Sequence, residues 1–187
     1  MFVTETMLAA MVSRYGRPAH REFTVATTEK EIQRIRASQK FGRNHDVTLY
    51  VRKDNDWLVI AKHFYPPGLY RSMSGGLAPG EDFEAGVARE AREELGCRIR
   101  LRRFLLTTEV HFESPTDALD WRSFVFLADY VDGDLNFTDT REIREVRQVP
   151  WSAFAEFTRI MRAGDMGGLH YRAALHEAVA ELLATAD

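Results

Sequence analysis

The chain has 187 residues, of which 45% are hydrophobic and 28% are charged, and its formal net charge is −3. This is the composition of an ordinary soluble protein with a core; the small charge gives no argument for nucleic-acid binding, and no apolar run approaches the ~20 residues of a transmembrane helix. The single cysteine, Cys97, cannot form an internal disulfide, so we expect a cytoplasmic, single-domain protein over residues 1–187 with no nucleic-acid or membrane partner.

Residues 1–45 form an N-terminal extension in which two helices are expected. Met7–Val12 has the length of a short helix. The basic residues of the N-terminus, Arg14 and Arg17, follow this apolar stretch, which argues against a signal peptide. Thr28 and Glu31 have the spacing of a capping box and begin a second helix that ends near Lys40. The extension has three possible roles: packing on the core, which is the simplest, covering the substrate, or forming a homodimer contact.

Residues 46–151 are expected to form the core, which begins with a hairpin. Apolar and polar side chains alternate over Val47–Arg52, which predicts a strand with one buried face. The run Trp57–Ala61 is continuously apolar and predicts a strand buried on both faces. Residues 53–56 supply the turn between the two strands.

The loop over residues 63–76 contains two candidate substrate-binding side chains. Arg71 can bind a phosphate, and Tyr70 can stack on a base, because loops beside a catalytic helix often carry binding groups. The alternative is that both residues are exposed and only shape the loop. Gly75 and Gly76 end this segment and allow backbone amides to approach a ligand closely.

A helix that begins near Asp82 and ends at Gly96 carries the strongest signal for chemistry. Its residues Glu90, Glu93 and Glu94 follow an i, i+3, i+4 spacing, so their carboxylates share one face. Three negative charges at such short separation destabilise an isolated helix, whereas a divalent cation bound to them would stabilise it. Magnesium prefers oxygen ligands and is often shared between carboxylates and substrate phosphates.

Further strands and two closing helices complete the prediction. Strands are expected over residues 98–112, 121–131 and 146–149, with Arg98, Arg100 and Arg102 on a solvated face. Ser152 is the expected N-cap of one C-terminal helix, and a second helix runs from His170 to about Ala184, within a C-terminal segment 152–187. His170 and His176 are expected on its polar side. The order of elements predicts an α/β protein with helices on both faces of a mixed sheet.

The segment Gly75–Cys97 resembles the signature of the Nudix hydrolases. The signature's fixed residues are present at their proper spacing, with small residues, Ala91 and Cys97, at its two apolar positions. The matching fixed residues are Gly75, Glu81, Arg89, Glu90, Glu93, Glu94 and Gly96. Chance would produce such a match about once in 10⁹ start positions.

The resemblance implies a fold, an activity and a set of roles. The fold is an α/β/α sandwich with a mixed β-sheet, to which this chain adds the N-terminal helical segment and the C-terminal helices. The activity is hydrolysis of a phosphoanhydride bond in a nucleoside diphosphate linked to another group, with Mg²⁺ or Mn²⁺ as cofactor. The expected metal ligands are Glu90, Glu93 and Glu94, one of which doubles as the base. Arg89 orients the glutamates, with Glu81 as its partner or as an outer ligand.

A fourth carboxylate is expected from outside the helix. Because Nudix hydrolases often supply it from the loop before the last core strand, Glu142 is the first choice. Glu145 in the same loop and Glu109 on a strand are the alternatives. The competing function is a non-catalytic nucleotide sensor, against which the intact signature argues. The substrate stays open: the proline typical of the ADP-ribose group is absent, because Glu113 occupies its position and Pro115 comes two residues later.

Overall fold

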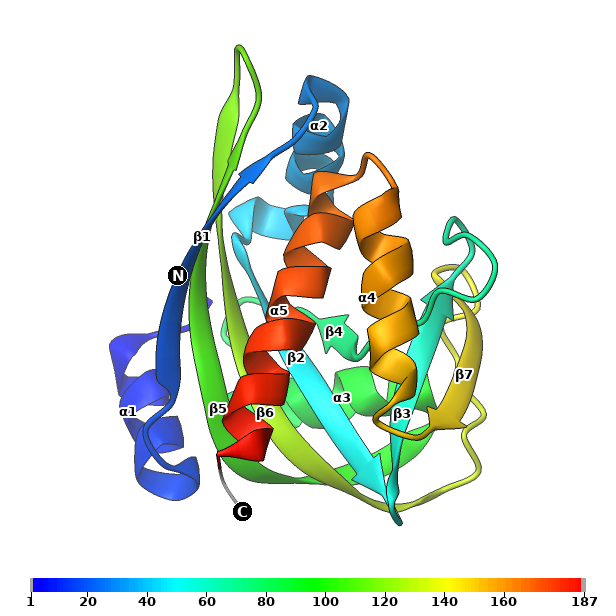
Figure 1. The fold of residues 1–187 in the computed structure, drawn as a ribbon. Coiled ribbons are helices and arrows are strands. Elements are labelled where there is room, and N and C mark those ends of the chain that lie inside the picture. The colour runs from blue at the N-terminus through cyan, green and yellow to red at the C-terminus, as the bar shows by residue number, and fades with distance from the viewer. Residues whose placement is uncertain (1, 186–187) are drawn as a thin grey trace.

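The computed structural model describes residues 2–185. Its helices are α1 (Glu5–Tyr15), α2 (Glu29–Ser38), α3 (Phe83–Leu95), α4 (Ala153–Ala163) and α5 (Gly167–Ala184), with a 3₁₀ turn η1 (Lys40–Gly42). Its strands are β1 (Ala19–Ala26), β2 (His45–Lys53), β3 (Asp56–Lys62), β4 (Met73–Gly75), β5 (Cys97–Glu113), β6 (Ala118–Gly133) and β7 (Ile143–Val149). Figure 1 shows their arrangement.

The strands form one mixed sheet in the order β1-β5-β6-β2-β3-β7, with β4 paired to β2 beside this path. β1 runs parallel to β5, and β2 runs parallel to β6. The other neighbours, β5–β6, β2–β3, β2–β4 and β3–β7, are antiparallel. The predicted hairpin of β2 and β3 is therefore confirmed.

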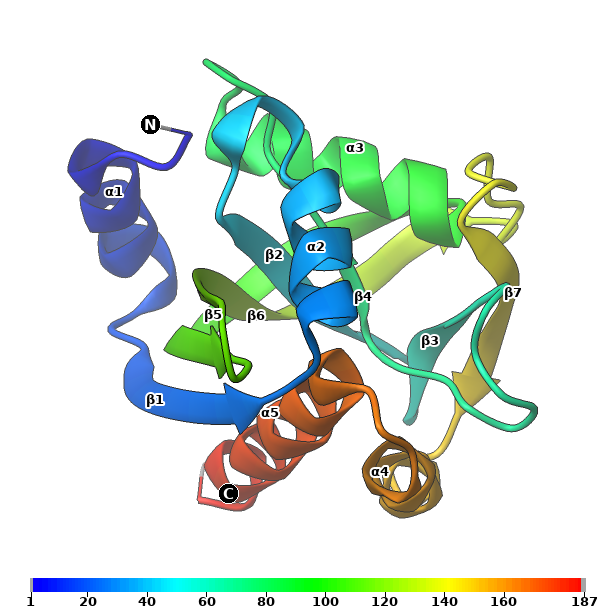
Figure 2. The ribbon, with the colours of Figure 1, turned by 90° about the horizontal axis from the view of Figure 1, so that it is seen from above.

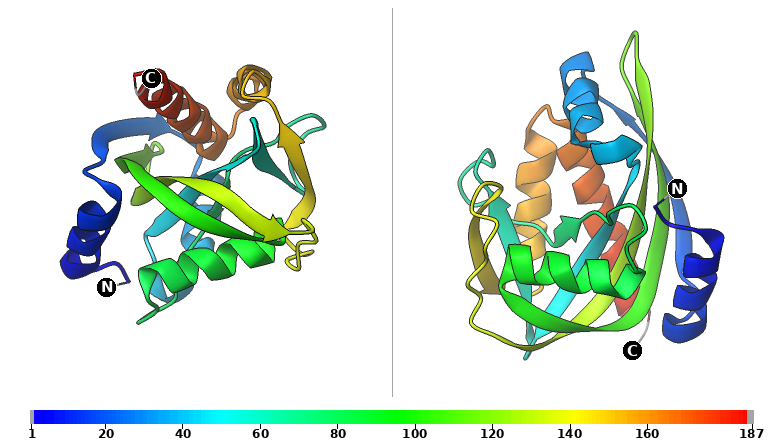
Figure 3. Two further views of the ribbon diagram at one scale, coloured as in Figure 1. Left: turned by 90° about the horizontal axis from the view of Figure 1, so that it is seen from below. Right: turned by 180° about the vertical axis from the view of Figure 1, so that it is seen from behind.

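Helices cover both faces of this sheet, as Figures 2 and 3 show. α3 and α1 pack on one face, where Phe83, Leu95 and Met11 join a core with Phe124 and Phe126. α4, α5 and Ile32 of α2 pack on the other face in a second core. The predicted α/β/α sandwich with a mixed sheet is confirmed. None of the helices in the described part of the chain is both long and apolar enough to cross a membrane.

One strand was missed and two local predictions were wrong, each because of a long-range contact. β1 was not predicted, since most of its side chains are exposed and its place in the sheet comes from pairing with β5. β2 is buried on both faces rather than one, because α5 covers the face that carries Tyr50. His176 lies in the core instead of on the polar side of α5, and its Nδ1 is 2.5 Å from the Tyr50 hydroxyl.

The helix ends follow local chemistry in most cases. The Thr28 and Asp82 side chains accept hydrogen bonds from the backbone N–H groups of Glu31 and Ala85, which caps α2 and α3. Gly96 ends α3 in the left-handed conformation, and a Cβ there would lie 2.4 Å from backbone atoms of Asn136. Ser152, by contrast, makes no side-chain capping bond to α4, and α5 already begins at Gly167.

The buried His176 should make the protein sensitive to acid. Burial lowers the pKa of His176 to about 3, with Arg172 and Arg71 acting in the same direction. In the unfolded chain the pKa of a histidine is about 6.5. Below that pH the imidazole is therefore protonated in the unfolded state while it stays neutral in the native state. The stabilisation is therefore present above about pH 6.5 and is lost, at up to about 1.4 kcal/mol per pH unit, as the pH falls.

We expect His176→Gln to flatten the dependence of the free energy of unfolding on pH between pH 6.5 and 4.5. Urea unfolding at several pH values in this range would measure the free energy of unfolding and its slope against pH. Tyr50→Phe is the control, because it removes the hydroxyl but leaves His176 buried, so the slope should persist. Equal slopes for the unmodified protein and His176→Gln would contradict the assignment.

Candidate active site

A cavity opens where β3 diverges from β2. The two strands pair only at Val51–Lys53 and Asp56–Leu58, whereas β4 pairs with β2 at Val47–Leu49. The cavity, of about 910 Å³, lies between α3, β2, α5 and the loop before β7. It is lined by Ala37, Ser38, Lys40, Arg43, Asp46, Lys62, Arg71, Ser74, Gly75, Gly76, Arg89, Glu90, Glu93, Glu94, Trp121, Thr138, Asp139, Thr140, Arg141, Glu142 and Arg172.

The two glycines before α3 let its carboxylates lie against the loop. A Cβ on Gly75 would be 2.3 Å from the carboxyl group of Glu90, so a side chain at this position would displace the glutamate. The backbone N–H of Gly76 donates to Glu90 Oε1 at 3.2 Å. The glycines thus bring backbone and carboxylate into direct contact. The two small apolar residues of the signature, Ala91 in α3 and Cys97 at the start of β5, are both buried.

Arg89 holds the carboxylates of this face together. Its Nε and Nη2 donate to the two oxygens of Glu81 at 2.9 and 3.0 Å. Its Nη1 donates to Glu90 at 2.8 Å and to Glu93 at 3.1 Å, and its Nη2 also reaches the carbonyl of Gly76 at 3.1 Å. A guanidinium has five N–H donors, so these contacts engage the whole group. The Arg89 contact holds the pKa of Glu81 below its ordinary value.

Glu94 is the buried carboxylate of the cavity. Only 4% of the residue is exposed, and its Oε2 has no hydrogen-bond partner within residues 2–185. Burial raises its pKa to about 7, an effect that Arg71 and Lys62 oppose and that Glu90 and Glu142 reinforce. Burial also raises the pKa of Glu90, against the influence of Arg89. A buried carboxylate without a hydrogen-bond partner costs free energy, so the binding of a cation at Glu94 would be favourable.

The donor set fits a hard divalent cation. Within residues 2–185, Arg89 and Gly76 engage one oxygen of Glu90, and Arg89 engages one oxygen of Glu93, which leaves the second oxygen of each glutamate without a hydrogen bond. Carboxylate oxygens are the ligands that Mg²⁺ and Mn²⁺ prefer. In the described part of the chain, one group of three potential metal ligands already has its ligand atoms within 4.8 Å of one another. This group lies outside the cavity, at exposed positions of β1 and β5, and consists of His20, Glu22 and Glu109.

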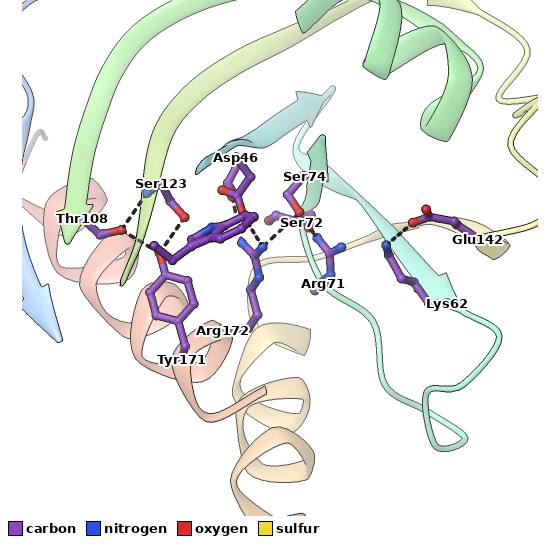
Figure 4. Close-up of polar contacts among 12 residues, drawn as sticks. Asp46, Lys62, Arg71, Ser72, Ser74, Thr108, Ser123, Glu142, Tyr171 and Arg172 are labelled. Atoms are coloured by element: carbon purple, nitrogen blue, oxygen red, sulfur yellow. Dashed lines mark hydrogen bonds and ion pairs between the residues drawn. The ribbon is translucent and has the colours of Figure 1, made fainter. Parts of the chain in front are cut away.

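A second part of the cavity wall is basic, and some of it comes from α5 (Figure 4). Arg172 donates to Asp46 at 2.6 Å, to Thr48 at 2.9 Å and to Ser74 at 3.1 Å. Arg71 also donates to the Ser74 hydroxyl, at 3.0 Å, and has no carboxylate within 4 Å among the described residues. This basic wall and the carboxylates of α3 line the same cavity.

Arg172 was not predicted, because an arginine on a C-terminal helix has no motif around it. Its position depends on the preceding Tyr171, whose hydroxyl is 2.7 Å from both Thr108 of β5 and Ser123 of β6. These buried contacts fix the rotation of α5 and direct Arg172 towards Asp46 (Figure 4). A signal that could have pointed to this residue is the buried acid Asp46 at the start of β2, which needs a cation.

The other predicted residues divide into two groups. Arg71, Gly75, Gly76 and Glu142 line the cavity with Arg89 and the α3 glutamates. Tyr70 is not brought there: its hydroxyl donates to Glu145 at 2.6 Å, on β7. Tyr70 and Arg71 are only 5% and 3% exposed, so the alternative of an exposed loop was wrong.

The three candidates for a fourth carboxylate lie in different places. Glu142 accepts from Lys62 at 2.5 Å, and this contact holds its pKa below the ordinary value. Glu145 is engaged by Tyr70 and Arg147 on β7. Glu109 is paired with Arg122 on the exposed part of β5, in a different pocket. Among the three, Glu142 is the one that shares the cavity with Glu94.

The contacts of Arg89 lead to a prediction. Arg89→Lys keeps the charge but replaces a rigid fork of donors by a single ammonium, which cannot hold Glu81, Glu90 and Glu93 at once. We expect kcat to fall about 10-fold and the half-saturating Mg²⁺ concentration to rise, because a charge-assisted hydrogen bond contributes about 1.5–3 kcal/mol. Steady-state kinetics over a Mg²⁺ series would measure both. Unchanged values would show that Arg89 is dispensable for the carboxylates.

The chain is similar to known proteins in sequence and in fold. A family model described as the NUDIX domain matches residues 42–169, which is more than half of the chain. The NAD-capped RNA hydrolase NudC of Vibrio parahaemolyticus serotype O3:K6 is 27% identical over 137 residues, which cover 73% of this chain and 47% of that protein. The protein of the same name from Photobacterium profundum is 29% identical over 140 residues, covering 74% and 47%. The chain thus spans about half the length of these curated relatives.

Solved structures share the fold at low sequence identity. A UDP-X diphosphatase superposes with a TM-score of 0.55 at 13% identity, covering 83% of this chain and 72% of that chain. A NUDIX hydrolase from Nitrosomonas europaea gives a TM-score of 0.50 at 18% identity, covering 74% and 90%. With a complete signature on α3 and a family match over residues 42–169, the chain belongs to the Nudix hydrolase family.

Proposed function

We propose that this protein is a divalent-metal-dependent hydrolase that cleaves a phosphoanhydride bond in a nucleoside diphosphate linked to another group. The observation that carries the proposal is the pairing of two walls in one cavity. The acidic wall contains Glu94, buried and without a hydrogen-bond partner for its Oε2 within residues 2–185, together with Glu90 and Glu93. The basic wall of the same cavity contains Arg71 and Arg172. A polyphosphate with bound divalent cations complements both walls.

The chemistry follows from what phosphoryl transfer needs. When bound, Mg²⁺ or Mn²⁺ neutralises phosphate oxygens and activates water. Glu90, Glu93 and Glu94 would hold the ion, and Arg89 would keep the first two in place. Arg71 and Arg172 would receive phosphate oxygens and orient the bond for in-line attack. Positioning and charge neutralisation supply most of the catalysis in this reaction class.

A substrate panel tests the proposal directly. The panel contains ADP-ribose, NAD⁺, a UDP-sugar, a dinucleoside polyphosphate and coenzyme A, each with Mg²⁺, with Mn²⁺ and with EDTA. We expect metal-dependent release of a nucleoside monophosphate from at least one of them. Tight binding without cleavage of any member would instead indicate a nucleotide sensor.

The panel also includes an NAD-capped RNA, because the relatives named above are described as hydrolases of that substrate. Cleavage of the capped RNA in preference to free NAD⁺ would overturn the expectation that nucleic acid is not a partner. We further propose that the protein works in the cytoplasm and that Mg²⁺ is its usual ion. A homodimer contact through the N-terminal extension is proposed as well, and light scattering would measure the molar mass in solution.

A further prediction concerns the fourth carboxylate. We expect Glu142→Gln to lower kcat about 10-fold and to raise the Mg²⁺ requirement. Glu142 lines the same cavity as Glu94 and helps to raise its pKa, and a ligand at the reacting centre stabilises developing charge. Glu109→Gln is the matched control, since that side chain lines a different pocket. If Glu109→Gln lost most of its kcat while Glu142→Gln kept the kcat of the unmodified protein, the fourth carboxylate would come from β5.

A further inference from the structure

Several cations that line the cavity have no ion-pair partner among the described residues. Three of its cations are paired: Lys62 with Glu142, Arg89 with the glutamates of α3, and Arg172 with Asp46. Four others have no carboxylate within 4 Å in residues 2–185, namely Lys40, Arg43, Arg71 and Arg141. Arg71 is already expected to bind phosphate, which leaves three cations contributed by the α2–β2 connection and the loop before β7.

Arg43 is the most constrained of these three. Its Nε is buried, and its guanidinium makes no hydrogen bond in the described part of the chain. The group lies directly against Gly76: a Cβ on that glycine would be 1.3 Å from Arg43 Nη1 and 1.9 Å from its Cζ. The absence of a side chain at position 76 is therefore what gives the Arg43 guanidinium its place beside the loop that contacts Glu90.

The backbone before Arg43 is bent in a way that serves this placement. Phe41 has φ 58° and ψ 26°, and Gly42 has φ 77°, so two consecutive residues adopt the left-handed conformation. A left-handed phenylalanine costs of order 1–3 kcal/mol, and its side chain regains little by packing, since 84% of the residue is exposed. The bend lets the side chains on both sides of it, those of Lys40 and Arg43, line the cavity.

We propose that Arg43 is a substrate-binding residue that contacts a phosphate group of the substrate in this cavity, which Lys40 and Arg141 also line. An unpaired guanidinium with free donors is the group best suited to bind phosphate oxygens in a forked contact. The inference rests on the proposed function and adds a substrate class to it. The substrate carries an anionic group beyond those that Arg71 and Arg172 receive, either a further phosphate of a small nucleotide or a phosphate of an attached RNA chain.

Binding of inorganic triphosphate, measured by calorimetry in the presence of Mg²⁺, tests this proposal without requiring turnover. We expect Arg43→Met to raise the Kd at least about 10-fold, because hydrogen bonds to charged groups contribute about 1.5–3 kcal/mol. Gly76→Ala should raise it similarly by displacing the guanidinium, and adding Arg43→Met to that variant should have little further effect. Arg34→Met, an exposed arginine on α2 outside the cavity, is the matched control and should bind as the unmodified protein does.

The outcomes separate this proposal from the proposed function. A Kd for Arg43→Met within twofold of the unmodified protein would overturn the role of Arg43, whatever the substrate panel gives. Weakened binding by Arg43→Met would support it even if the panel shows no cleavage. A second arm distinguishes the source of the phosphate by titrating ADP and a 5′-phosphorylated ten-nucleotide RNA. If Arg43 binds the chain, the variant loses more affinity for the RNA, with a smaller salt dependence; an equal loss for ADP assigns the contact to the small nucleotide.

Discussion

Glu94→Gln is expected to lower kcat by at least about 10²-fold. The substitution keeps the shape of the side chain and removes its charge from a site where the residue is 4% exposed. Charged and dipolar groups aligned with developing charge are worth roughly 3–4 kcal/mol, because water cannot screen them in such a site. Steady-state kinetics with the substrate found in the panel would measure the loss, and EDTA should abolish the activity of the unmodified protein.

The matched control for this experiment is on the same helix. Glu84→Gln makes the same chemical change at a residue that contacts Tyr15 and Arg14 outside the cavity. It should leave kcat unchanged. Full activity of the unmodified protein in EDTA, or of Glu94→Gln in Mg²⁺, would refute the role of the carboxylates as metal ligands.

Asp46→Ala is expected to lower the free energy of unfolding by about 3 kcal/mol. Burial alone would raise the pKa of Asp46, but Arg172 and neighbouring hydrogen bonds hold it below its ordinary value, so the native state contains a buried ion pair. Removing one member leaves the other charge without compensation, which typically costs about 3–5 kcal/mol. We expect the lower part of this range, because the Arg172 side chain borders the cavity and is 15% exposed.

Urea unfolding of paired variants separates this effect from simple loss of contacts. Asp46→Ala combined with Arg172→Met should recover much of the lost stability, since an apolar side chain replaces the uncompensated charge. Glu156→Ala, which breaks an exposed pair with Arg159 on α4, should change the free energy of unfolding by less than about 1 kcal/mol. A double variant as unstable as Asp46→Ala would show that the charge is not the cause.

Much of the fold could be predicted because it depends on local pattern. The helix that carries the signature begins at a capping Asp82 and ends at a left-handed Gly96, both of which act within one turn. The continuous apolar run of β3 and the solvated arginines of β5 likewise follow from neighbouring residues. The common face of Glu90, Glu93 and Glu94 is a property of helical spacing alone, so the acidic wall of the cavity was predictable.

The basic wall was decided by the tertiary structure. Arg172 belongs to a helix whose local sequence contains no functional motif, and the Tyr171 contacts with β5 and β6 determine which way it points. Arg43 reaches the cavity because Gly76 leaves space for its guanidinium on a distant loop. Local periodicity determines which face of an element is polar. Long-range packing determines which of the many arginines lies in the same cavity as the carboxylates, and no short window of sequence contains that information.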